Sequence, residues 1–264
     1  MNASAANVEQ LQRTVRSSWP QFEADEREAV MSVLVSGKVN ALVHGGECDA
    51  FASEFADFLG VDHALCMANG TVTMEVALRA LGVGPGDEVI VPARSFFATA
   101  SCVAAVGALP VFADVLTPSQ NIDPESVKRM INSRTRAMIC VHLAGWPCDM
   151  AALGDICEAH GLFLIEDCAQ AHGAAIDGRK VGNFGDAASF SFCTDKIMST
   201  GGEGGLLVMR DPEAHKRAWS LKDHGKNPEK LSDGKGIPGQ FRYIHDGMGS
   251  NARMTEMQAA IGRV

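Results

Sequence analysis

Short apolar runs separated by amphipathic stretches dominate the sequence and constrain its fold more than any other feature. Each amphipathic stretch is long enough for a crossover helix, which joins two parallel strands. Short, wholly apolar runs are typical of strands that are buried on both faces, so helices must cover the sheet on each side. The pattern predicts an α/β fold, an α/β/α sandwich around a mostly parallel sheet. The expected strands are residues 64–68, 88–91, 109–113, 137–141 and 162–165, and the expected helices are residues 23–36, 49–59, 71–81, 97–106, 124–131 and 150–159.

The two ends of the chain show weaker patterns. Residues 1–20 carry no clear period and are expected to form a loose N-terminal arm. Residues 226–239 collect Lys, Gly, Asn, Asp and Pro, which predicts a mobile surface loop. The helical pattern at residues 254–264 reaches the last residue without a glycine cap, so we expect a further domain beyond it. Residues 21–264 are therefore expected to form one large domain.

The composition excludes two broad classes of partner. Lysine and arginine number 23 and aspartate and glutamate 32, which gives a net charge of −9. A chain this acidic is not expected to offer a broad grip on phosphate backbones, so we expect no nucleic-acid partner. The longest mildly apolar stretch, residues 97–113, is broken by Pro110 and diluted by small residues, which argues against a membrane partner.

The cysteines indicate a reducing environment. None belongs to a C-x-x-C pair, and most lie inside apolar segments such as residues 64–68, as reduced core thiols do. Residues 1–20 contain no basic segment followed by an apolar one, so no secretory signal is visible. We therefore expect a cytoplasmic protein. The cysteines are Cys48, Cys66, Cys102, Cys140, Cys148, Cys157, Cys168 and Cys193.

The common short motifs of nucleotide and hydrolytic sites are absent from the sequence. It contains no G-x-x-x-x-G-K-[ST], no G-x-S-x-G and no H-E-x-x-H. The glycines at residues 201–205 do not form G-x-G-x-x-G, because Leu207 stands at the third required position. Candidate residues lie instead where the expected strands end and helices begin, which is the usual ligand crevice of an open parallel sheet.

Two of these strand ends carry features of a cofactor site. Asn69-Gly70-Thr71 follows a strand and opens a helix, so free N–H groups and the helix dipole favour a phosphate. A plain turn with Thr71 near the helix cap explains this segment equally well. Asp167 follows a buried strand, where its carboxylate needs a cationic partner such as a protonated pyridine nitrogen. A helix cap or a structural ion pair is the alternative for Asp167.

Residues 186–196 alternate as a strand and end at Lys196, directly before the glycine-rich segment. A lysine on a rigid support beside phosphate and pyridine sites suits a Schiff-base cofactor, because lowered basicity supplies the neutral amine nucleophile. Phe96 offers a flat face to a ring, although a core position is the usual one for a phenylalanine. These residues together indicate a site for a ring-bearing phosphate cofactor.

With these residues in this order, the chain resembles the DegT/DnrJ/EryC1/StrS sugar aminotransferases, within the aspartate aminotransferase superfamily of pyridoxal phosphate enzymes. The resemblance implies the large domain of pyridoxal phosphate fold type I, with the family's small C-terminal domain absent from this sequence. The motifs that carry it, specific in this order, are Ser36-Gly37-Lys38, Asn69-Gly70-Thr71, residues 84–89, residues 92–99, residues 166–170, residues 189–196, residues 202–205 and residues 249–254.

Site roles follow from the resemblance, position by position. It implies a homodimer whose site is shared between subunits, and pyridoxal 5′-phosphate as the cofactor. Lys196 is implied as the Schiff-base lysine and Asp167 as the partner of the pyridine nitrogen. The remaining implied roles are Gln170 near the phenolic oxygen, Phe96 stacked on the ring, Gly70, Thr71 and Ser191 on the phosphate, and Asn251 on the phosphate of the neighbouring subunit.

The activity that the resemblance implies is transfer of an amino group from an amino acid to a keto-sugar. The family suggests glutamate as the donor and a nucleotide-linked sugar as the acceptor. A sugar dehydratase that uses the same cofactor is one alternative, but relatives of that kind replace the lysine at position 196 by histidine. A truncated, non-catalytic regulatory or assembly subunit is the other alternative, since the small domain is missing.

One departure from the family pattern adjoins the reactive lysine. Cys193-Thr194-Asp195 stands where relatives more often show an aromatic residue or histidine, then proline, then serine or threonine, so a carboxylate neighbours the amine. On the predicted strand, Asp195 and Lys196 would point to opposite faces.

We expect no metal site, because no His and Cys spacing resembles a ligand set. The structural or rim histidines are taken to be His142, His172 and His224.

Overall fold

The computed structural model describes residues 19–42, 45–232 and 244–264. The predicted N-terminal arm lies outside the described residues except for Trp19 and Pro20. Trp19 is in contact with the rest of the chain, since its Nε1–H donates to the backbone oxygen of Thr194 at 2.7 Å. The predicted loop at 226–239 is described only as far as residue 232.

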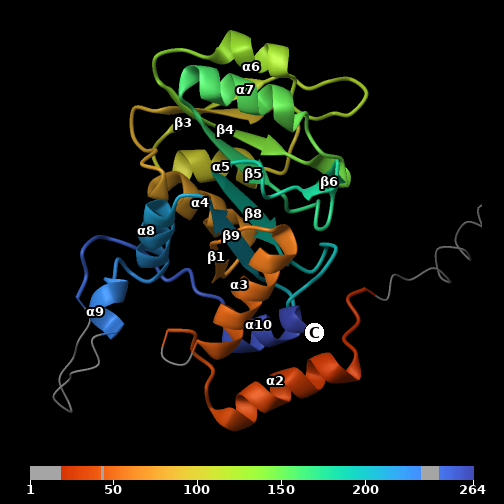
Figure 1. Cartoon of the computed structure of the whole chain (residues 1–264), viewed down its shortest axis with the longest axis vertical. Coiled ribbons are helices and arrows are strands. Elements are labelled where there is room, and N and C mark those ends of the chain that lie inside the picture. Colours follow the sequence, from red (N-terminus) through yellow and green to blue (C-terminus); the bar gives the residue numbers. More distant parts are fainter. Residues whose placement is uncertain (1–18, 43–44, 233–243) are drawn as a thin grey trace, which may run out of the picture.

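A single seven-stranded sheet forms the centre of the molecule, in the order β1-β9-β8-β5-β4-β2-β3 (Figure 1). β3, β2, β4, β5 and β8 run parallel to one another, whereas β9 is antiparallel to both β1 and β8. The predicted α/β class and the mostly parallel sheet are confirmed. The strands are β1 (Ala64–Met67), β2 (Glu88–Pro92), β3 (Leu109–Ala113), β4 (Thr135–Val141), β5 (Phe163–Asp167), β8 (Ala187–Ser191) and β9 (Gly205–Met209), and β6 (Ala175–Ile176) pairs with β7 (Arg179–Lys180) outside the sheet.

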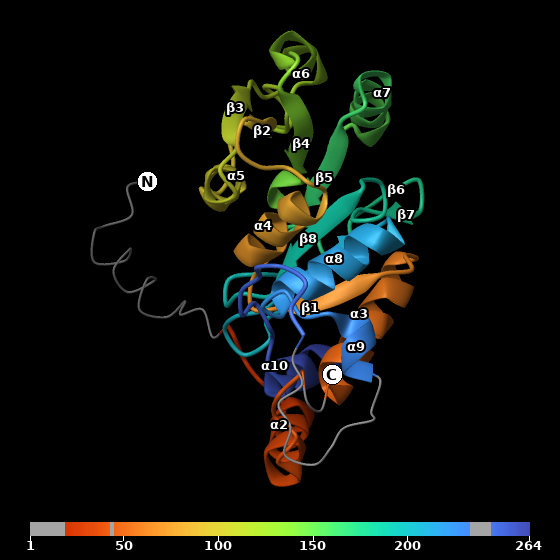
Figure 2. The same ribbon diagram turned by 90° about the vertical axis from the view of Figure 1, so that its left-hand side faces the viewer.

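Helices flank both faces of the sheet, as the turned view in Figure 2 shows. Several helices begin at a residue whose side chain accepts a hydrogen bond from a backbone N–H of the first turn, as Asn69 does for α4 and Asp149 for α7. The helices are α2 (Ala24–Ser36), α3 (Gly46–Leu59), α4 (Gly70–Ala80), α5 (Ala98–Ala105), α6 (Pro124–Met130), α7 (Met150–His160), α8 (Pro212–Lys222), α9 (Pro228–Ser232) and α10 (Glu256–Arg263), with a 3₁₀ turn at Leu143–Gly145. No helix in the described part of the chain is both long and apolar enough to cross a membrane.

Alternate strand residues divide the core into two layers. Val89 and Val91 pack on one face of the sheet in a cluster with side chains of α4, α5 and α8. Ile90, between them, packs on the opposite face with side chains of α6 and α7. Phe51 and Phe55 of α3 pack on this second face against Phe190 and Phe192. Because successive side chains of a strand point to opposite faces, the sheet buries both of its faces under helices, as the predicted sandwich requires.

Two segments of the sheet differ from the sequence-based expectation. The strand expected at residues 186–196 ends at Ser191, so Lys196 lies in the turn that follows it. The glycine-rich segment that follows leads directly into β9, which was not predicted and which inserts between β1 and β8. Because β9 is antiparallel to both neighbours, β1 and β8 are parallel. The carboxyl ends of β1, β2, β5 and β8 therefore lie at one edge of the sheet.

The cysteines are unpaired, and seven of the eight are buried as expected of core thiols. Cys193 is the partly exposed one, because it lies in the turn after β8.

Candidate active site

A cavity of about 520 Å³ opens at this edge of the sheet, where β1, β5 and β8 end. It is lined by side chains from segments far apart in the sequence. Lys196 and Asp167 both line it, so the lysine and the acid lie on the same side of the molecule. The predicted residues that line the cavity are Gly70, Thr71, Phe96, Asp167, Gln170, Ser191 and Lys196.

The start of α4 forms one wall of the cavity. Asn69 caps this helix through Oδ1, which accepts from Val72 N at 3.0 Å, so the earlier N–H groups of Gly70 and Thr71 precede the intrahelical bonds. The backbone at Gly70 lies close to β8, because a Cβ added there would meet the Cβ of Ser191 at 2.8 Å. Backbone donors and the hydroxyl groups of Thr71 and Ser191 thus suit an anion such as a phosphate.

Asp167 brings a buried carboxylate to the cavity from the end of β5. Its side chain accepts hydrogen bonds from Ala169 N at 3.2 Å and from the Thr99 hydroxyl at 3.1 Å. Burial raises the pKa of Asp167, and these two donors together with the charges of His142 and Lys196 partly oppose that rise. A buried carboxylate with only neutral hydrogen-bond donors is well placed to pair with a cation that enters the cavity.

Lys196 contacts the carboxylate that precedes it in sequence. Its Nζ lies 3.0 Å from Asp195 Oδ2, and its side chain is 18% exposed whereas that of Asp195 is 73% exposed. The prediction that these neighbours point apart is wrong, because the strand ends at Ser191 and the two residues lie in a turn. Lys196 N also closes this turn by donating to Cys193 O at 3.1 Å.

Gln170 and Phe96 also line the cavity, Gln170 through a hydrogen-bonded amide and Phe96 through an exposed ring. Gln170 Oε1 accepts from Ala144 N at 2.7 Å, which leaves the amide NH₂ as the group free to donate. Phe96 is 71% exposed although it lines the cavity, so it is not a core aromatic residue. An exposed ring at the mouth of a cavity is available to stack on a flat ligand.

Asn251 is the one predicted site residue that does not line the cavity. It is exposed and forms an isolated antiparallel bridge with Asp223 at the end of α8. The buried Asp223 fastens this segment, since it pairs with Lys222 at 2.6 Å and with Arg253. The position of Asn251 is therefore fixed on the surface of its own chain.

Several cavity residues were not predicted from the sequence. Asp195, Cys193 and Glu203 surround Lys196, and Ser95 lies beside Phe96. The signal that could have found Glu203 is its place between pairs of glycines directly after the lysine segment. Ser95 and Thr99 are two hydroxyl residues on either side of the predicted start of the helix at residue 97, which is a weaker signal.

Glu166 and Asp167 are neighbours on β5 and therefore point to opposite faces of the sheet. Glu166 is fully buried and accepts from Gly182 N, Phe184 N and Gly185 N at 2.7–2.8 Å. His142 Nε2 lies 3.0 Å from the same carboxylate, and Nδ1 accepts from Cys148 N, so the neutral ring carries its hydrogen on Nε2. Burial raises the pKa of Glu166, but these hydrogen bonds outweigh it and lower the pKa overall.

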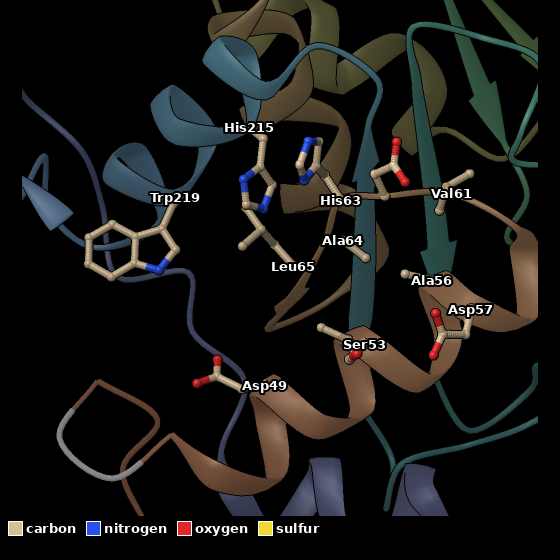
Figure 3. A pocket seen from close by; sticks show the side chains of 12 residues that line it. Asp49, Ser53, Ala56, Asp57, Val61, His63, Ala64, Leu65, His215 and Trp219 are labelled. Atoms are coloured by element: carbon tan, nitrogen blue, oxygen red, sulfur yellow. The ribbon is translucent and has the colours of Figure 1, made fainter. Parts of the chain in front are cut away.

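His142, Glu166 and Cys168 are the one group in the described residues with ligand atoms close enough for a metal. The Glu166 carboxylate and both ring nitrogens of His142 are used by the hydrogen bonds just described, as expected of structural residues. A second groove, of about 400 Å³, lies over β1 between α3 and α8 (Figure 3). His63 and His215 stack there at 4.9 Å between ring centroids, opposite Asp49 and Asp57 of α3. None of the predicted site residues lines this groove.

The seven-stranded sheet and its flanking helices have the fold of the type I pyridoxal phosphate aminotransferases. A lysine and a buried acid converge there beside a helix start at the carboxyl edge of the sheet. The chain belongs to the DegT/DnrJ/EryC1/StrS aminotransferase family, which it matches over residues 20–264.

Individual relatives share both sequence and structure with the chain. It is 42% identical over 243 residues to GDP-perosamine synthase of Vibrio cholerae, covering 92% of this chain and 62% of the relative. The X-ray structure of the aminotransferase from Psychrobacter cryohalolentis superposes with a TM-score of 0.89 at 47% identity, covering 94% of this chain and 62% of that one. A Bacillus subtilis structure, NtdA with bound cofactor PMP, gives a TM-score of 0.79 at 29% identity, covering 91% and 52%. The chain thus spans about three fifths of the length of the first two relatives.

Proposed function

We propose that residues 21–264 form the cofactor-binding large domain of a pyridoxal 5′-phosphate-dependent aminotransferase. The proposed reaction moves an amino group from glutamate to a nucleotide-linked keto-sugar. The single observation that carries the proposal is the convergence of Lys196 and Asp167 in one cavity with the start of α4. GDP-perosamine synthase, whose name includes a nucleotide-linked sugar, supports the acceptor class.

The residues of the cavity fit this cofactor. The N–H groups of Gly70 and Thr71, with the hydroxyl groups of Thr71 and Ser191, would hold the phosphate. Asp167 would pair with the ring nitrogen, and this pairing supplies the cation that its buried carboxylate lacks. The NH₂ of Gln170 would donate to the phenolic oxygen, and Phe96 would cover one face of the ring.

Bound pyridoxal 5′-phosphate would supply an aldehyde carbon that accepts an amino group and a ring that takes up negative charge from the donor's α-carbon. Lys196 would hold the cofactor through Nζ until the donor amine displaces it. The freed Lys196 amine would then act as general base and general acid, removing the proton from the α-carbon of glutamate. Asp167 would keep the ring nitrogen positively charged throughout. Asp195 is positioned to form an ion pair with Lys196 when the lysine is a free ammonium.

Borohydride trapping tests this proposal directly. Full-length protein mixed with pyridoxal 5′-phosphate and then reduced is expected to carry one pyridoxyl group on Lys196, located by peptide mass spectrometry. Lys196→Ala should lose the label and roughly 10²–10⁴-fold of 2-oxoglutarate release from glutamate with a nucleotide-linked keto-sugar. Lys38→Ala, which changes an exposed lysine that does not line the cavity, is the matched control. A wild-type protein that stays unlabelled would reject an aminotransferase and leave a non-catalytic subunit.

We propose further that the protein is a homodimer in which Asn251 reaches the phosphate of the neighbouring subunit. The exposed position of Asn251 outside its own cavity supports this arrangement. Mixing Lys196→Ala with Asn251→Ala tests it, because a hybrid dimer would contain one site with both native residues. Activity that reappears on mixing supports a shared site, and activity that stays at the level of the separate variants contradicts it.

A further inference from the structure

Thr99 links Asp167 to a chain of hydroxyl groups at the start of α5. It is 1% exposed, and its Oγ1 lies 3.1 Å from Asp167 Oδ2 and 2.7 Å from Ser95 Oγ. Ser95 lies in the bend before α5, four residues ahead of Thr99, and lines the cavity beside Phe96. The three side chains therefore form a continuous path from the cavity wall to the buried carboxylate.

The direction of this path follows from the number of hydrogens available. An ionised carboxylate only accepts, so the single hydroxyl hydrogen of Thr99 must be donated to Asp167. Thr99 Oγ1 then has no hydrogen left for Ser95, and Ser95 must donate to Thr99. Each donor polarises the next one, which strengthens the bond that reaches the carboxylate.

Few other groups favour the ionised form of Asp167. The remaining hydrogen-bond donor is Ala169 N, at 3.2 Å from Oδ1. The charged or titratable groups that face Asp167 are His142 at the end of β4, Lys196 in the turn after β8, Cys102 on α5 and the adjacent Cys168. Burial raises the pKa values of both thiols to about 12, so they stay neutral. His142 and Lys196 are therefore the groups whose positive charge favours the ionised carboxylate. Loss of Thr99 would remove one of two direct donors.

We propose that Thr99 is a positioning residue for the aminotransferase reaction, and that Ser95 supports it. Through the Ser95–Thr99–Asp167 hydrogen bonds, Thr99 keeps the Asp167 carboxylate ionised and fixes Oδ2, so that the carboxylate can hold a protonated pyridine nitrogen. The inference rests on the proposed function, because it assigns Thr99 a task toward the same cofactor. Thr99 does not line the cavity itself, so it would act on the cofactor through Asp167.

The test follows the proton on the cofactor nitrogen rather than turnover. Full-length protein is loaded with pyridoxal 5′-phosphate that carries ¹⁵N in its ring, and the ¹⁵N chemical shift is recorded against pH. In Thr99→Val, which keeps the shape and removes the hydroxyl, the nitrogen should lose its proton about one pH unit lower than in the wild type. The dissociation constant of the cofactor should rise about tenfold. Thr99→Ser should restore both values, and Ser95→Ala should give a smaller shift in the same direction.

The controls separate this inference from the function on which it rests. Thr135→Val makes the same change at a buried threonine at the opposite, amino-terminal end of β4, and should leave the titration unchanged. A Thr99→Val titration equal to the wild type, or a Thr99→Ser protein as impaired as Thr99→Val, would overturn the role of the hydroxyl. If Thr99→Val does not fold by circular dichroism, the titration of Ser95→Ala decides the question in the same way. A wild-type protein that takes up no cofactor would overturn the proposed function itself.

Discussion

His172 should make the protein less stable as the pH falls. Its imidazole packs against Phe190 and Phe192, with ring centroids 5.6 Å away in each case. Neither ring nitrogen is exposed or has a hydrogen-bond partner among the described residues. Burial, together with the charge of Lys196, lowers the pKa of His172 to about 4 from the ordinary 6.5.

This shift fixes the sign and the size of the effect. The folded pKa lies below the unfolded one, so the unfolded chain binds the proton more tightly between pH 6.5 and 4, and stability is complete above pH 6.5 and falls below it. A shift from 6.5 to about 4 corresponds to a loss of about 2 kcal/mol at pH 5 and about 3 kcal/mol at pH 4, relative to pH 7.

His172→Phe removes the titrating group and keeps an aromatic ring, and the adjoining apolar cavity of about 330 Å³ leaves room for it. Urea denaturation at pH 7, 6 and 5 would give the free energy of unfolding of the variant and the wild type. The difference between them should move in favour of the variant by about 2 kcal/mol from pH 7 to pH 5. His160→Gln, at an exposed position of α7, should follow the wild type. A difference that stays constant over this pH range would refute the assignment of His172 as a buried neutral imidazole.

Two further changes test the packing around the site. Gly205→Ala should destabilise the protein by roughly 1–3 kcal/mol, because the new Cβ would lie 2.4 Å from the Asn69 backbone. Gly154→Ala, at an open position of α7, should instead stabilise the protein by up to about 1 kcal/mol. Thermal unfolding measures both changes. Glu166→Gln should cost roughly 1–3 kcal/mol in denaturant unfolding, because an amide cannot replace every acceptor that serves Gly182, Phe184 and Gly185. An unchanged Glu166→Gln would show that these bonds are not needed.

The fold class followed from the sequence because its signal is local. Apolar runs such as residues 88–91 and 137–141 fall within two residues of β2 and β4, since a strand buried on both faces must be apolar along its length. The placement of Asp167 and Gly70 at the cavity was also predicted, because the ends of parallel strands share one edge of a sheet. The family motifs supplied Gln170, Phe96 and Ser191, whose roles stay predictions.

Other features depended on contacts between distant segments, which a local pattern cannot encode. The insertion of β9 between β1 and β8 depends on the close backbone approach of Gly205 to Asn69. The Lys196–Asp195 contact appeared only because β8 ends early, at Ser191. The hydrogen bond from Thr99 to Asp167 joins residues 68 positions apart, and only the tertiary fold brings them together. Sequence alone therefore determined the fold class and predicted which residues would bear the chemistry. Tertiary packing decided which of them touch, because side-chain direction is set by the register of neighbouring elements.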